Sequence, residues 1–147
     1  MDESSALISL SFGGGVQSTA LLLLMLNHDQ RLLDAIGGPR LLPTVAIFAD
    51  PKSESQSTYD HIERMSAECD AHGFPLIQCS AGDLFDDLLH AERFASIPVF
   101  TRSPSTGKVG MLRRGCTSEY KIQPIKQALR ALMGLQKGQH VKRQCHV

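Results

Sequence analysis

The sequence predicts an α/β fold, in which helices cover both faces of a doubly wound parallel sheet. Short β-branched or aromatic runs alternate with segments whose apolar residues recur at helical spacing, and glycine or proline separates them. One of these runs is apolar throughout, which is typical of a central strand buried on both faces. The chain has 147 residues, of which 42% are hydrophobic, and this suffices for one domain.

The first βα unit opens the chain. Residues 7–12 (LISLSF) predict a strand that ends at three glycines, 13–15, which a helix interior would tolerate poorly. Gln17, Ser18 and Thr19 suit the first turn of a helix that follows. Residues 20–26 are all apolar, so we expect this helix to be buried on most sides until it ends near residue 27.

Two further βα units follow. Residues 44–49 (TVAIFA) form the apolar run of the central strand, and residues 58–72 predict a helix that stops at Gly73. Residues 75–79 predict a third strand, and Asp83 is expected to cap a helix over residues 84–89. The order βαβαβα favours a parallel sheet.

The C-terminal third is less regular. Residues 95–115 show no periodicity and predict a loop of roughly 20 residues, a length typical of functional lids or disordered segments. A last helix is expected from Pro124 to Gly134. We therefore expect a domain over residues 1–134 and a basic tail over residues 135–147.

Charge is unevenly distributed along a chain whose formal net charge is zero. Residues 1–101 hold five basic and fourteen acidic side chains, whereas residues 102–147 hold ten basic and one acidic, so the C-terminal third is suited to face an anion. The longest apolar run has seven residues, far fewer than the roughly 20 of a membrane helix. Asp2 and Glu3 do not fit a secretory signal, so a cytoplasmic location is expected.

The glycine segment is the strongest indication of function. Three glycines between a strand end and a helix start let backbone N–H groups and the helix dipole meet a phosphate, and nearby hydroxyls could add donors. The alternative is a plain βα turn in which glycine only permits close packing. Two common phosphate loops do not fit the sequence. The Walker loop, GxxxxGK[ST], requires Ser or Thr after Gly-Lys, but Val109 follows Gly107-Lys108. The Rossmann loop, GxGxxG, requires Gly at the third position after Gly15, where Ser18 stands.

These residues resemble the adenine-nucleotide α-hydrolase, or PP-loop ATP pyrophosphatase, superfamily, and within it the phosphoadenosine phosphosulfate (PAPS) reductase-like branch. The family loop reads SGGxDS; here Gly13 stands for the first Ser, Gly14 and Gly15 for the pair, Gln17 for the Asp, and Ser18 for the last Ser. The resemblance covers residues 7–134 and implies a Rossmann-like, HUP-type fold and a role in sulfur metabolism.

The same resemblance implies that the sheet is incomplete at its C-terminal end. In the family a further strand follows the last helix and pairs beside the first strand, whereas residues 135–147 contain no apolar run. We therefore interpret the chain as an N-terminal part of a longer family protein or a short member. The strand at residues 7–12 would be left as an open edge, through which we expect dimers or aggregates to form.

A second block, Phe48-Ala49-Asp50 with Glu54, Thr58 and Tyr59, is similar to the family segment FADTGxExxxTY, which carries adenine and ribose. Pro51 and Lys52 replace the Thr-Gly pair, so the turn is expected to differ locally. The alternative for Asp50 is that of a turn former at a strand end.

A third block, residues 116–125, is similar to the family segment CxxxxKxxPL, so that Lys121 would meet a phosphate or sulfate. Arg113 and Arg114 suit the same role, and a solvated basic face is the alternative. Thr117 stands where iron–sulfur members have a second adjacent cysteine, and the other cysteines are scattered at 69, 79 and 145. No iron–sulfur cluster is expected, and Cys145 is interpreted as a tail thiol.

The resemblance implies two catalytic residues, Cys116 and Lys121, and no metal ligand. The nucleotide-binding residues that it implies are Ser11, Gly13, Gly14, Gly15, Gln17, Ser18, Thr19, Phe48, Asp50, Glu54, Arg113 and Arg114. The expected ligand is ATP or PAPS, and the chemistry is attack at the α-phosphorus, aided by Mg²⁺, or thiol attack on a sulfonucleotide. We expect this chain to turn over substrate slowly or not at all. The alternative is a non-catalytic binding module, or a subunit of a nucleic-acid modification system that uses the basic third.

Overall fold

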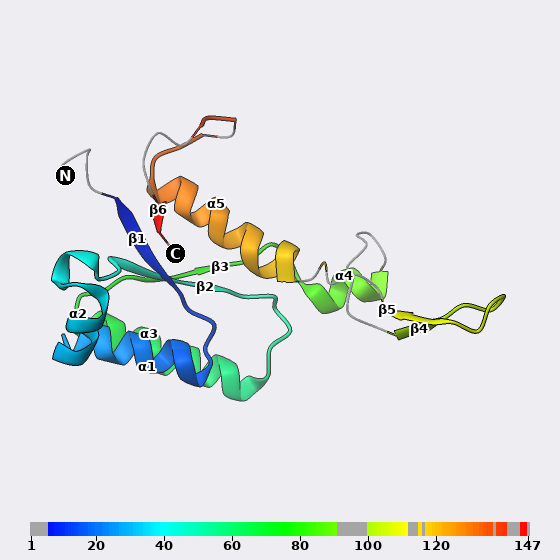
Figure 1. Cartoon of the computed structure of the whole chain (residues 1–147), viewed down its shortest axis with the longest axis horizontal. Coiled ribbons are helices and arrows are strands. Elements are labelled where there is room, and N and C mark those ends of the chain that lie inside the picture. Colours follow the sequence, from blue (N-terminus) through cyan, green and yellow to red (C-terminus); the bar gives the residue numbers. More distant parts are fainter. Residues whose placement is uncertain are drawn as a thin grey trace.

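The computed structural model describes residues 6–90, 100–111, 115, 117–136, 138–140 and 145–146. Within them, four strands form a sheet in the order β3-β2-β1-β6, and every neighbouring pair is parallel (Figure 1). The strands are β1 (Leu7–Ser11), β2 (Val45–Ala49), β3 (Leu76–Cys79) and β6 (Cys145–His146). The predicted parallel α/β sheet is therefore confirmed.

Helices cover both faces of this sheet. The helices α1 (Val16–Leu26) and α3 (Gln56–Ala71) lie on one face, and α5 (Gln123–Leu132) lies on the other (Figure 1). All five residues of β2 are buried: Ala46 and Phe48 join the core beneath α1 and α3, whereas Val45 and Ile47 join the core beneath α5. This doubly wound arrangement is compatible with a Rossmann-like fold.

Capping side chains set where three helices begin. Asp29 caps α2 (Gln30–Ile36), Ser55 caps α3, and the Asp83 carboxylate accepts from the N–H groups of Phe85 and Asp86 in α4 (Leu84–His90). The predicted cap at Asp83 is confirmed. The predicted stop at Gly73 is confirmed as well, because its φ of +64° lies in the left-handed region that favours glycine.

Helix α1 departs from the expectation that it is buried on most sides. Only Leu22, Met25 and Leu26 are buried, whereas Val16 is 88% exposed and Leu21 is 41% exposed. The prediction was wrong because a helix that is apolar all round is buried all round only if other elements cover every side. The sheet covers one side of α1, and the opposite side would need a further layer.

The segment predicted as a long loop contains a β-hairpin. Strands β4 (Phe100–Arg102) and β5 (Val109–Met111) pair antiparallel, and Gly107 has φ +65° in the turn between them. The sequence did not reveal these strands because each has three residues, too few to display an alternation. After the hairpin, a π-helical turn, η2 (Thr117–Ile122), leads into α5, whose start agrees with the predicted position of Pro124.

The first strand is not an open edge along its whole length. Leu7 and Ile8 of β1 pair with Cys145 and His146 of β6, so the expectation of an unpaired outer edge is wrong for these residues. The tail escaped prediction because a two-residue strand carries no periodicity of its own and depends on β1 for its hydrogen bonds. Among the described helices, none has the length and apolar character to cross a membrane.

Candidate functional site

The turn between β1 and α1 is built around Gly14. The backbone of Gly14 has φ +69°, and a Cβ at this position would lie 3.0 Å from Cδ1 of Ile62, so only glycine fits without strain. At Gly13 and Gly15, by contrast, an added Cβ would have no heavy atom of the described residues within 4 Å apart from those of the glycine and its two neighbours in the chain. Close packing therefore accounts for Gly14, whereas Gly13 and Gly15 face open space.

The N-terminus of α1 has backbone donors to offer. The first helical bond runs from the N–H of Thr19 to the carbonyl of Gly15 at 3.0 Å, so the N–H groups of Val16, Gln17 and Ser18 precede any intrahelical acceptor. Gly15 is the N-cap and has no side chain to accept from them, unlike the N-caps of α2, α3 and α4. This end of α1 is suited to an anion.

The hydroxyls expected to serve the phosphate are already engaged. Ser18 Oγ donates to the carbonyl of Gly15 at 3.1 Å, and Thr19 Oγ1 lies 2.9 Å from His61 Nε2 on α3. Sequence reasoning missed His61, whose position on one face of α3 with Thr58, three residues earlier, was the available indication. Ser11 and Gln17 are exposed at the loop.

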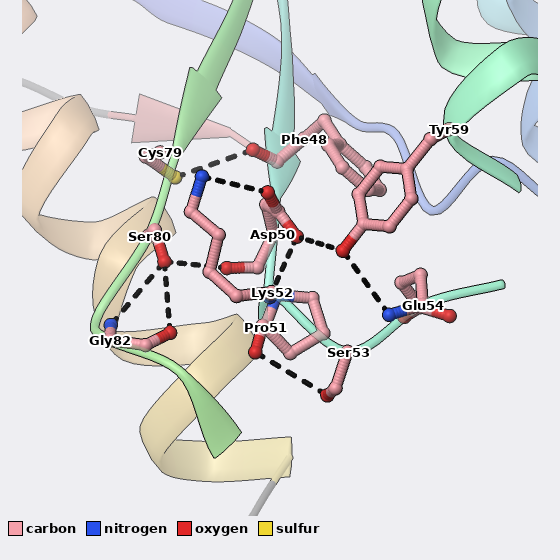
Figure 2. Close-up of polar contacts among 10 residues, drawn as sticks. All are labelled: Phe48, Asp50, Pro51, Lys52, Ser53, Glu54, Tyr59, Cys79, Ser80 and Gly82. Atoms are coloured by element: carbon pink, nitrogen blue, oxygen red, sulfur yellow. Dashed lines mark hydrogen bonds and ion pairs between the residues drawn. The ribbon is translucent and has the colours of Figure 1, made fainter. Parts of the chain in front are cut away.

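Asp50, at the carboxyl end of β2, is the centre of a buried polar network (Figure 2). Asp50 is only 5% exposed, and its Oδ1 accepts hydrogen bonds from the N–H of Lys52 at 2.7 Å and from the Tyr59 hydroxyl at 3.0 Å. The Lys52 ammonium lies 3.1 Å from Oδ2. Burial alone would raise the pKa of Asp50, but the hydrogen bonds and charge of Lys52 and the bond from Tyr59 outweigh it, so that this pKa lies below its ordinary value.

Lys52 has a backbone φ of +61°, in the left-handed region that glycine favours and lysine rarely adopts. The hydrogen bond from its N–H to Asp50 forms an Asx turn, so the turn-former interpretation of Asp50 holds for the backbone. The Lys52 ammonium also neutralises the Asp50 carboxylate, and a turn alone does not require this ion pair. Lys52 is a second residue of the site that sequence reasoning missed.

The second and third sequence blocks meet beside this network. Lys121 Nζ on η2 lies 3.0 Å from Glu54 Oε1, 67 positions earlier in the chain. The N–H of Glu54 donates to the Tyr59 hydroxyl at 3.2 Å. Burial and the neighbouring Asp50 carboxylate raise the pKa of Tyr59, so its hydroxyl keeps its proton and donates a hydrogen bond to Asp50.

Not every residue that the resemblance implied takes part. Phe48 is 2% exposed in the core beneath α1 and α3, where its side chain packs. Arg113, Arg114 and Cys116 lie outside the described residues, so the catalytic role of Cys116 stays a prediction. A groove of about 540 Å³ lies between α1 and α3, and Gly14, Thr19, Thr58 and His61 help to line it.

The strand order places the glycine loop where nucleotide sites occur in open α/β sheets. From β1 the chain moves through β2 to β3 on one side, and β6 then lies on the other side of β1. Ligands in such sheets bind at the carboxyl ends of the strands, where the strand order reverses. The order reverses beside β1, and the glycine loop follows β1.

Comparison with protein-family models, curated proteins and solved structures gives no match.

Proposed function

We propose that this chain binds an adenine nucleotide at the carboxyl edge of its parallel sheet, with the phosphates on the glycine loop and the N-terminus of α1. The observation that carries the proposal is the contrast among the glycines: Gly14 is required by packing, whereas Gly13 and Gly15 border open space beside an N-terminus without a capping side chain. Backbone N–H groups that have no acceptor within the helix suit a phosphate at such a point.

The end of β2 supports the same proposal. Lys52 holds the left-handed backbone at the position of the Gly in the family segment, so the substitution preserves the turn and adds a cation. Glu54 and Lys121 belong to two separate family-like blocks and form an ion pair. These contacts would place a nucleotide over β2, with Lys121 near its charged groups and the Asp50 network beneath it.

The reaction class that we favour is that of the PAPS reductase-like branch, at a sulfonucleotide or at the α-phosphorus of ATP. The described loop residues do not fit a protein-bound Mg²⁺ ion, because Gln17 replaces the family Asp and Asp50 is already bound by Lys52 and Tyr59. Lys121 and the positive N-terminus of α1 would stabilise charge on the transferred group.

A thermal-shift panel with ATP, AMP, PAPS and adenosine phosphosulfate, each with and without Mg²⁺, tests the proposal. A ligand at 100 times its dissociation constant should stabilise the fold by about 2.7 kcal/mol. Stabilisation by PAPS but not by ATP would select the sulfonucleotide. No stabilisation by any of the four would contradict nucleotide binding, and salt-sensitive binding of an oligonucleotide would favour the non-catalytic nucleic-acid module instead.

A further inference from the structure

Helix α4 carries an apolar stripe that nothing in the described structure covers. Phe85, Leu88 and Leu89 stand at positions i, i+3 and i+4, on one face of the helix, and are 62%, 38% and 64% exposed. The opposite side of α4 is held to the body, because the N–H of Leu84 donates to the carbonyl of Pro51 at 3.0 Å and Asp87 accepts from the Tyr120 hydroxyl. The stripe is thus a fixed surface of the fold.

The β4–β5 hairpin carries a second such surface. Its register pairs Phe100 with Met111 and Arg102 with Val109, which places these four side chains on one face of the hairpin. Phe100, Val109 and Met111 are 78%, 67% and 59% exposed. The hairpin extends away from the sheet and from α5 (Figure 1). A two-stranded hairpin is at best marginally stable unless its apolar face is packed, so this face calls for a partner.

The two surfaces are complementary in charge. The exposed Asp83 and Asp86 lie beside the stripe, and Asp86 Oδ1 is also 2.9 Å from His90 Nδ1. The segment 100–111 contains Arg102 and Lys108 and no acidic residue. An apolar stripe with acidic neighbours fits an apolar face with basic neighbours, whereas two copies of either surface would bring like charges together.

We propose that a second copy of this chain is the partner, and that α4 of each protomer packs on the β4–β5 hairpin of the other. The two surfaces are exposed at the same time, so the hairpin does not cover α4 of its own chain. A two-fold dimer forms the contact twice and leaves neither surface uncovered, which closes the assembly. This inference does not depend on nucleotide binding.

Complementation between two variants tests this arrangement. Phe85→Ser weakens the helix surface and Phe100→Ser the hairpin surface, and both residues are exposed, so the fold should persist. We expect sedimentation equilibrium to show a wild-type dimer, and each variant to raise the dimer dissociation constant about tenfold or more. Val16→Ser, an 88% exposed apolar residue outside both surfaces, is the control and should leave the constant unchanged.

The mixture of Phe85→Ser with Phe100→Ser gives the decisive result. Their heterodimer retains one intact contact, formed by the wild-type helix of one variant and the wild-type hairpin of the other, so it should be several-fold tighter than either variant's homodimer. A wild-type monomer at about 100 μM would overturn the proposal. A heterodimer no tighter than the homodimers would also overturn it, and so would a Val16→Ser variant whose dimer is weakened as much as those of the other two. A monomer that binds an oligonucleotide, and loses this binding in Phe100→Ser, would overturn it as well.

Discussion

At the scale of single residues, adjacent glycines in the β1–α1 loop have different physical roles. Gly14 is constrained by its positive φ and by Ile62, whereas Gly15 has an ordinary φ of −86° and open space at its Cβ position. A side chain at Gly15 would therefore meet a ligand and spare the fold, and one at Gly14 would disturb the fold itself.

Gly15→Val should abolish binding of ATP and PAPS while the chain stays folded, because its side chain would occupy the approach of the phosphate to the N-terminus of α1. Valine is a poorer N-cap than glycine, so a small loss of stability is expected. Calorimetric titration measures the affinity, and circular dichroism with thermal unfolding checks the fold. The contrasting variant is Gly14→Ala, which should lower the free energy of unfolding by about 1 kcal/mol or more, because of its strained φ. Unchanged nucleotide affinity in Gly15→Val would contradict the phosphate site.

Asp50 should give the fold an acid-sensitive contribution to stability. Its pKa in the folded protein is lower than the ordinary 3.8, so the unfolded chain binds this proton more tightly than the folded chain. The contribution is fully present above the ordinary pKa and is lost as the pH falls through the lower, folded-state pKa.

Asp50→Asn should remove this acid-sensitive component and lower stability at pH 7 by about 1–3 kcal/mol, because Lys52 loses its charged partner. Urea unfolding across acidic pH measures both effects. Asp70→Asn, at an exposed position of α3, is the matched control and should alter neither. An unaltered pH dependence in Asp50→Asn would show that other carboxylates govern acid unfolding.

At the scale of elements, the sheet separates the thiols. Cys69 belongs to the core beneath α1 and α3, whereas Cys79 and Cys145 pack in the core beneath α5. Burial raises the pKa of all three, so they are poor thiolate ligands at neutral pH.

The protein should contain no iron–sulfur cluster, because ligation by four cysteines would require thiols from both faces of the sheet to meet. Anaerobic purification, iron and sulfide assays and an absorption spectrum check this expectation. Reconstitution with iron and sulfide is the more stringent test. Stoichiometric iron after reconstitution would contradict the expectation and would require a set of ligands other than four cysteines.

At the scale of the whole molecule, β6 closes part of the sheet. Cys145 also packs against the core beneath α5, so this short strand connects the end of the chain both to β1 and to the helix layer. The edge of β1 at Leu7 and Ile8 then becomes available only when β6 is removed.

Deletion of residues 145–147 should lower the unfolding temperature and increase association, because it exposes the paired edge at Leu7 and Ile8. Thermal unfolding with light scattering measures both, and deletion of Val147 alone is the control for a shorter chain. If the longer deletion left both properties as in the control, β6 would contribute nothing to the sheet.

The site was predictable to different degrees. The glycine loop and Asp50 stood out in the sequence because strand ends and turn chemistry are local features. The Thr19–His61 bond and the Glu54–Lys121 ion pair join residues 42 and 67 positions apart, and no local pattern marks such pairs. The hairpin and β6 were missed for a related reason, since their strands are too short to show periodicity.

The sequence by itself determined the three βα units, the central position of β2 and the place of the glycine loop, because hydrophobic periodicity, capping and glycine conformation act over a few residues. Only the tertiary structure decided that β6 pairs with β1, that Lys52 neutralises Asp50, and that much of α1 is exposed. These features depend on which distant segments meet and on how many layers cover each element, and both are properties of the packed chain.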